Sequence, residues 1–341
     1  MPKSKSYYED LQKTFFEQIA AKMLPHQSLV DEVAEILDIG VDGAYRRKRA
    51  DSFLKFNELV QLAEKFQISL DELIHGASSD AVVFRPSGLG QVNLDFESYL
   101  ESLLKLVSHI QVQKVQKGYF AAKDIPVFHL FQFPELARFK MFFWQKTIFN
   151  APDLAGEKFH LGEMDEKMER CISLCRQIAD KYSQIPTIEI WNEETSVSIL
   201  KQILYYYEAG LFAGRKDAIR LLEMVQAYFE HLQQEAGLGY KFLAGNPPAN
   251  RVENFELYYN DLILIDNVIH LEYENDSQTF LVYNSIEYLA TANDDFNGQV
   301  TAWIQNLLRK SDLISKVAEK QRNRFFHSIF RRIERLKEDL D

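Results

Sequence analysis

Apolar residues recur every three or four positions along most of the first 245 residues, and this spacing indicates amphipathic helices. Within the first 75 residues the pattern predicts about five short helices, which can close a small core. Longer helices are predicted at residues 94–110, 135–147, 164–183, 193–210 and 215–236. Their serial order is similar to an α-hairpin array, although no 34-residue repeat is found.

From Asn254 the apolar pattern changes to one typical of strands. Runs rich in β-branched and aromatic residues predict strands at 119–122, 127–131, 255–259, 268–273 and 279–283. The turn-prone residues 275–277 divide the last two runs and predict a hairpin. Helices are predicted again at 296–310 and 318–339. The fold class is therefore mainly α with a smaller β part, an α+β protein whose larger domain contains a short antiparallel sheet.

Small and turn-prone residues at 76–80 and 85–90 separate the first helical part from the rest. We divide the chain into a five-helix domain at 1–78, a linker at 79–90 and an α+β domain at 91–341. The last is predicted to be helical over 94–245, to hold strands over about 254–284 and to end in helices over 296–339.

Charge is unevenly distributed along a chain whose net charge is -11. Residues 1–76 hold 10 lysines and arginines against 13 acidic residues, whereas residues 301–341 hold 10 against 6. The acidic balance argues against a protein that binds nucleic acid over its whole surface. A local basic surface stays possible, because exposed charges more than about 8–10 Å apart are largely screened at physiological salt.

Two cysteines, Cys171 and Cys175, exclude a disulfide-stapled secreted fold. They fall on one helical face, so we expect packed thiols in a reduced compartment. The first ten residues lack the apolar core of a signal peptide, and no stretch approaches the roughly 18 apolar residues of a membrane span. We therefore expect a soluble cytoplasmic protein that does not contact membranes.

Motifs for catalysis are absent from the sequence: there is no H-E-x-x-H, phosphate-binding P-loop, nucleophile elbow or calcium loop. The eight histidines are scattered, and no carboxylate pair stands out. The glycines between Gly210 and Lys216 are expected to form a turn that joins two helices. We expect no catalytic residues, no metal and no cofactor, and hence no enzyme.

The most informative segment begins at Ser28, which precedes an apolar helical run and is suited to cap it. Ala34 is a small residue able to face a following helix, which opens at Gly40 and places Ala44 inward. On that second helix Asp42, Tyr45, Arg46 and Arg49 share one face. The guanidinium group of arginine is suited to donate two hydrogen bonds to guanine, and further positive charges neutralise DNA phosphates. For a lone four-residue basic run, a solvated helix face is the competing interpretation.

The surrounding sequence favours a helix that recognises DNA over a solvated helix face. The segments Val33 to Arg49 (VAEILDIGVDGAYRRKR) and Asn57 to Leu73 (NELVQLAEKFQISLDEL) resemble the helix-turn-helix domain of the lambda-repressor-like (Cro/XRE) family. The resemblance covers about 70 residues. It implies a transcriptional regulator that places the helix Val41–Arg49 in the major groove of double-stranded DNA. The candidate DNA-binding residues are Ser28, Gly40, Val41, Asp42, Tyr45, Arg46, Arg47 and Arg49.

Arg46 and Arg49 lead this set, Tyr45 and Asp42 are secondary, and Ser28 either caps its helix or donates to a phosphate. Two positions depart from the family pattern. Arg47 stands where an apolar residue is usual, so Phe53 or Phe56 is expected to fill the inward face. Asp38 replaces the usual turn glycine.

A single recognition helix contacts few bases, so we expect a homodimer with residues 91–341 providing dimerisation. Sensing of a small-molecule effector by that domain is a further hypothesis. The arginine-rich C-terminal helix is expected to bury its apolar stripe and leave its arginines in water, with contact to DNA or an acidic partner as the alternative. Other functions left open are a protein-interaction scaffold with a vestigial helix-turn-helix, and an unrecognised enzyme in the C-terminal region.

Overall fold

The computed structural model describes residues 4–23, 27–66, 68–75, 82–87, 95–113, 115–247, 252–261, 267–283 and 285–340. The chain divides into two compact units, residues 1–83 and 84–341. Within the described ranges no helix is long and apolar enough to cross a membrane.

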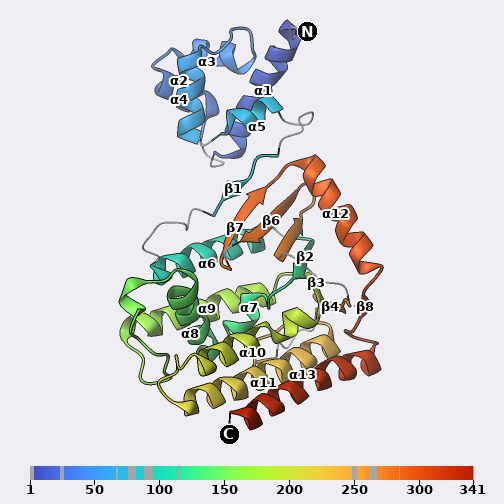
Figure 1. Ribbon diagram of the computed structural model, residues 1–341. Helices are drawn as coiled ribbons and strands as arrows, with labels where there is room; N and C mark the ends of the chain where they lie inside the picture. Colours follow the sequence, from blue (N-terminus) through green and yellow to red (C-terminus); the bar gives the residue numbers. More distant parts are fainter. Residues whose placement is uncertain are drawn as a thin grey trace. The chain divides into compact units, whose positions relative to one another are not determined.

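The described part of the first unit consists of short helices (Figure 1). They are α1 (Lys5–Ala21), α2 (Leu29–Leu37), α3 (Val41–Lys48), α4 (Phe56–Phe66) and α5 (Leu70–His75). Their apolar faces meet in one core that includes Phe15, Phe16, Ile19, Val33 and Leu62. The helical spacing in the sequence is therefore confirmed, and burial of these side chains is the main force that holds such short helices together.

The second unit is built on an eight-stranded sheet in the order β1-β7-β6-β5-β2-β3-β4-β8. The strands are β1 (Arg85–Pro86), β2 (Lys117–Ala122), β3 (Thr187–Trp191), β4 (Phe255–Tyr259), β5 (Asn267–Glu272), β6 (Ser277–Tyr283), β7 (Glu287–Thr291) and β8 (Asp312–Leu313). Strands β2, β3 and β4 are parallel, and the remaining pairs are antiparallel. The predicted β5–β6 hairpin is confirmed.

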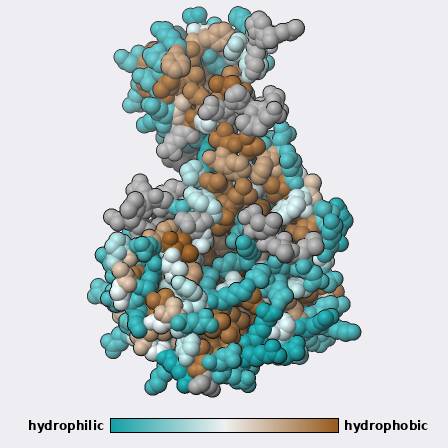
Figure 2. All heavy atoms as spheres, viewed as in Figure 1, coloured by the Kyte–Doolittle hydropathy of each residue, from teal (hydrophilic) through white to brown (hydrophobic). Residues whose placement is uncertain are grey.

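Helices cover both faces of this sheet (Figure 1). They are α6 (Phe96–Val112), α7 (Val127–Leu130), α8 (Pro134–Phe143), α9 (Glu166–Ser183), α10 (Glu193–Glu208), α11 (Arg215–Leu238), α12 (Asp294–Leu308) and α13 (Glu319–Asp339). On one face α12 packs against Ile188, Ile190 and Tyr119, and the other face carries the large core beneath the remaining helices. The surface over α10, α11 and α13 is mostly hydrophilic, whereas hydrophobic residues gather over β6 and β7 (Figure 2).

Three predictions for this unit need correction. The run 127–131 is not a strand, because Val127–Leu130 forms the single-turn helix α7 directly after Pro126. A short apolar run fits a buried helix as well as a strand, and the fixed φ of proline suits a helix start. Residues 187–191, within the stretch predicted to be helical over 94–245, form the interior strand β3, which is buried along its whole length. The sheet is consequently mixed and large, not short and antiparallel.

Other parts of the second unit agree with the sequence. Helices α8 to α13 lie where the apolar spacing predicted them, and Cys171 and Cys175 are free, buried thiols. The stripe of α13, including Phe326, Ile329 and Ile333, is buried as expected. Of the expected linker, Arg85–Pro86 pairs with β7, whereas residues 79–81 and 88–90 lie outside the described residues.

Candidate nucleic-acid interface

Local geometry holds α2 and α3 in a fixed turn. The Ser28 hydroxyl accepts a hydrogen bond from the Asp31 N–H at 3.4 Å, so its capping role is confirmed. After α2 the backbone of Asp38 adopts a left-handed conformation (φ 52°, ψ 50°), and the Ile39 N–H donates to the Ala34 carbonyl at 3.0 Å. Aspartate is among the few non-glycine residues that tolerate this region, which is why Asp38 serves where glycine is usual.

Helix α3 begins after Gly40 and turns one side toward α2. Ala44 is 1% exposed and belongs to the core that α3 shares with α2. Val41 and Tyr45 are each 47% exposed, and Asp42 and Arg46 are exposed beside them. The outward face expected from the spacing therefore exists as a surface of the first unit.

The two leading arginines differ in their surroundings. Within the described residues the Arg46 side chain makes no hydrogen bond or ion pair. Arg49 Nε lies 3.0 Å from Asp51 Oδ2, and the two side chains are 64% and 51% exposed. An ion pair this open contributes on the order of 0–1 kcal/mol, so Arg49 can exchange Asp51 for another anion at little cost.

Arg47 is not part of the outward face. Its Nε and Nη2 donate to the two carboxylate oxygens of Glu58, both at 2.8 Å, and its Nη1 donates to the Gly43 carbonyl at 3.2 Å. The Glu58 carboxylate also accepts from the Lys55 N–H at 3.0 Å. The hydrogen bond from Arg47 holds the pKa of Glu58 below its usual value, against the opposing effect of burial.

This ion pair takes the position where the family pattern has an apolar contact. Neither Phe53 nor Phe56 fills it, because they are 43% and 80% exposed. Instead Gln12 of α1 donates to the carbonyls of Arg47 at 2.6 Å and Ser52 at 2.9 Å, and thereby fastens the end of α3 to the rest of the unit. We therefore leave Arg47 out of the candidate contact surface.

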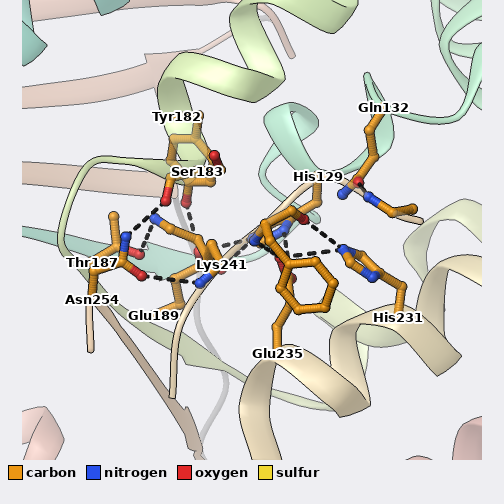
Figure 3. Close-up of polar contacts among 12 residues, drawn as sticks. His129, Gln132, Tyr182, Ser183, Thr187, Glu189, His231, Glu235, Lys241 and Asn254 are labelled. Carbon is orange, nitrogen blue, oxygen red and sulfur yellow. Dashed lines mark hydrogen bonds and ion pairs between the residues drawn. The ribbon is translucent and has the colours of Figure 1, made fainter. Parts of the chain in front are cut away.

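A second polar cluster lies within the large core of the second unit (Figure 3). The carboxylate of Glu189 on β3 accepts hydrogen bonds from His129 Nε2 at 2.8 Å, the Tyr182 hydroxyl at 2.6 Å and the Trp191 indole at 2.9 Å. Burial raises the pKa of Glu189, but the charges of His129 and Lys241 and the hydrogen bonds from His129 and Tyr182 outweigh it, and the pKa is lowered.

The cluster continues through α11 and the segment after it (Figure 3). Glu235 Oε1 accepts from the Phe242 N–H at 2.8 Å and lies 3.3 Å from His231 Nε2. Lys241 Nζ donates to the Ile185 carbonyl at 2.8 Å and to Thr187 Oγ1 at 2.6 Å. Burial lowers the pKa of Lys241 to about 7, although Glu189 and Glu235 act in the opposite direction.

Sequence reasoning missed this cluster, because its members are scattered over more than 100 residues. The available signal was Glu189, a lone carboxylate within the apolar run 188–191.

A carboxylate and an imidazole in contact are suited to proton transfer. Here Glu189 is 0% and His129 is 2% exposed, so solvent does not reach the pair. The evident role of the polar cluster is to hold β3, α7, α9 and α11 together.

The arginines of α13 are partly engaged within their own unit. Arg322 donates to the Lys316 carbonyl at 2.9 Å, and Arg332 pairs with Glu193 at the start of α10.

No family model, curated protein or solved structure matches this chain.

Proposed function

We propose that the protein binds specific sequences of double-stranded DNA through α3 and acts as a transcriptional regulator. The observation that carries the proposal is the division of α3 into two sides. Ala44 and Arg47 anchor one side, and the other side presents Tyr45, Arg46 and Arg49 to solvent. This is the arrangement that a helix needs to read base edges in a major groove.

Each exposed group has a chemical match in DNA. The guanidinium groups of Arg46 and Arg49 each span the O6 and N7 atoms of guanine. The Asp42 carboxylate accepts a hydrogen bond from the N4 amine of cytosine, and it also repels phosphate. Asp42 therefore contributes to sequence selectivity rather than to affinity. Lys48, exposed at the edge of this face, is suited to a phosphate.

Three further candidates lie at helix starts. The Ser28 hydroxyl accepts within α2 and still has its own proton to donate to a phosphate. Gly40 and Val41 are exposed at the beginning of α3, where free N–H groups favour an approaching phosphate.

A helix of this length touches few base pairs, so we propose that two copies of the chain bind together. Their α3 helices would enter successive major grooves about 34 Å apart, and the preferred site would be an inverted repeat.

The test begins with selection of bound fragments from random double-stranded DNA by the full chain. Affinity for the selected site is then compared between Arg46→Ala/Arg49→Ala and the charge-matched control Lys13→Ala/Lys65→Ala, which removes two exposed lysines from α1 and α4. At about 1–3 kcal/mol for each bidentate contact, the first variant should lose a factor of roughly 30 or more. The control should stay within about threefold of wild type, since it lowers only the general attraction to phosphate.

Equal affinities of the two double variants would refute the proposed roles. A selection that enriches no sequence would refute specific DNA binding itself.

A further inference from the structure

A mostly apolar cavity of about 110 Å³ lies in the second unit between helices α6 and α7 and the sheet. A second cavity of about 70 Å³ adjoins it, and the two share Leu103, Phe120, Phe128, Ile269 and Tyr288 as lining residues. An apolar cavity of about 150 Å³ is enough to hold benzene. The combined volume of the two adjoining cavities therefore suits a molecule of roughly six to eight carbon atoms.

The larger cavity has a polar end formed by α8 and the turn that follows it. Lys140 and Trp144 line this end and are 1% and 2% exposed. Lys140 Nζ donates to Asp124 Oδ2 at 3.3 Å and to Gln202 Oε1 at 3.1 Å. An ammonium group has three N–H donors, so one remains after these two bonds.

Trp144 supplies a second available donor. Its indole Nε1 is buried and has no hydrogen-bond partner among the residues that the structure describes. Leaving such a buried donor unsatisfied is unfavourable, and a bound acceptor removes this cost. Lys140 Nζ lies over the face of the Trp144 ring, 5.2 Å from its centre, so the ammonium group and the indole ring are neighbours.

The backbone at this end is also unusual. The α-helix α8 widens into a π-helical stretch, Trp144–Ile148, that begins at the same tryptophan. Such widened turns are rare and occur frequently at functional sites. Here the wider turn carries the indole whose N–H is unpartnered.

We propose that this cavity binds a small neutral molecule with an apolar body and one carbonyl oxygen, such as a ketone or an ester. The oxygen accepts hydrogen bonds from Lys140 Nζ and Trp144 Nε1, and the apolar body fills the space along α6. Asp124 already balances the charge of Lys140, so an anionic ligand would meet the Asp124 carboxylate. The Asp124 side chain is 33% exposed and Ser285 is exposed, which places the opening beside them.

This proposal does not depend on DNA binding. It is tested on the full chain with three probes of similar size: acetophenone, ethylbenzene, which lacks the oxygen, and benzoate, which carries a charge. Binding is titrated by saturation-transfer NMR and by the rise in melting temperature. Acetophenone should bind saturably, and ethylbenzene and benzoate should each bind roughly tenfold more weakly.

Variants assign the donors and the cavity. Lys140→Met and Trp144→Phe keep the apolar walls, and each should remove most of the preference for acetophenone over ethylbenzene. Lys146→Met is the matched control, because Lys146 lies on the same helical segment, bonds to the Leu154 and Ala155 carbonyls and does not line the cavity. Leu103→Trp should abolish binding of all three probes, with retention of the fold checked by circular dichroism.

Absence of saturable acetophenone binding to the wild type would overturn the proposal. Equal affinity for acetophenone and ethylbenzene, or tightest binding of benzoate, would overturn the chemical class assigned to the ligand. Unchanged binding to Leu103→Trp would show that the probes bind elsewhere, and would also overturn it.

Discussion

The ion pair between Arg47 and Glu58 offers the sharpest test of how the first unit is built. Replacing Arg47 with Met removes two charge-assisted hydrogen bonds and leaves the Glu58 carboxylate, 8% exposed, without its counter-charge. Breaking a buried pair costs about 3–5 kcal/mol. Here the arginine is 13% exposed and the Lys55 N–H still donates to Glu58, so we expect about 2–4 kcal/mol.

That loss is large for a unit of this size, whose total stability is on the order of 4–12 kcal/mol. Removing both charges gives a different result, because no buried charge is then left unpaired. The double variant Arg47→Met/Glu58→Met should lie within about 1–2 kcal/mol of wild type. Because each single variant leaves one charge unpaired and the double variant leaves none, the coupling energy from the cycle of single and double variants should be on the order of 2 kcal/mol or more.

The assay is urea unfolding of the full chain with two signals. Trp144, Trp191 and Trp303 all lie in the second unit, so their fluorescence reports that unit and serves as an internal control. Circular dichroism reports the helices of both units. The single variant should shift an early dichroism transition and leave the fluorescence transition in place.

Acid adds a second readout of the same pair. The Arg47 hydrogen bond, working against burial, lowers the pKa of Glu58. The stabilisation from this lowered pKa is present above the unfolded value of about 4.3 and is lost as pH falls through the folded value. Wild type should lose this contribution in acid, whereas the double variant has none to lose.

The alternative assigns Arg47 to a phosphate of bound DNA. Under that alternative, Arg47→Met weakens DNA binding without destabilising the first unit, and removing Glu58 as well restores nothing. That pair of results would refute our account of Arg47. Recovery of both stability and DNA binding in the double variant would support it.

Three other predictions concern packing and the buried cluster. Ala44→Leu should destabilise the first unit by about 1–3 kcal/mol in the same dichroism assay, because extra methylenes overpack the core that α2 and α3 share. Tyr45→Leu on the exposed side should change the stability by less than about 0.5 kcal/mol, and equal effects would contradict the two-sided helix. Burial lowers the pKa of Lys241 to about 7. Between pH 7 and the unfolded pKa of about 10.4 the unfolded chain binds more protons than the folded chain, so this group makes the stability rise with pH. Lys241→Met should lack this rise in urea unfolding followed by fluorescence, and parallel pH profiles of the variant and the wild type would contradict the prediction. Cys171 and Cys175 are buried and burial raises the pKa of both thiols, so iodoacetamide should label them only as the second unit unfolds, and rapid labelling of the native chain would contradict their placement.

The positions of most helices could be predicted because a helix is specified by neighbours along the chain. Apolar residues at three- and four-residue spacing mark the buried side wherever the partner lies, as α9, α10 and α11 illustrate. Local chemistry likewise predicted the Ser28 cap and the outward side of α3. The run 187–191 is rich in β-branched and aromatic residues, which favour a strand, but its place inside the sheet depends on partner strands far along the chain.

From the sequence alone follow the α+β class, the helical first unit and the exposed basic face of α3, since each depends on residues a few positions apart. Tertiary structure alone decided that Arg47 faces Glu58 rather than solvent, because the carboxylate that attracts it comes from another helix. It also decided that Glu189 meets His129 and that Lys140 and Trp144 close one end of a cavity. Those contacts join residues brought together by packing, and no periodicity along the chain encodes them.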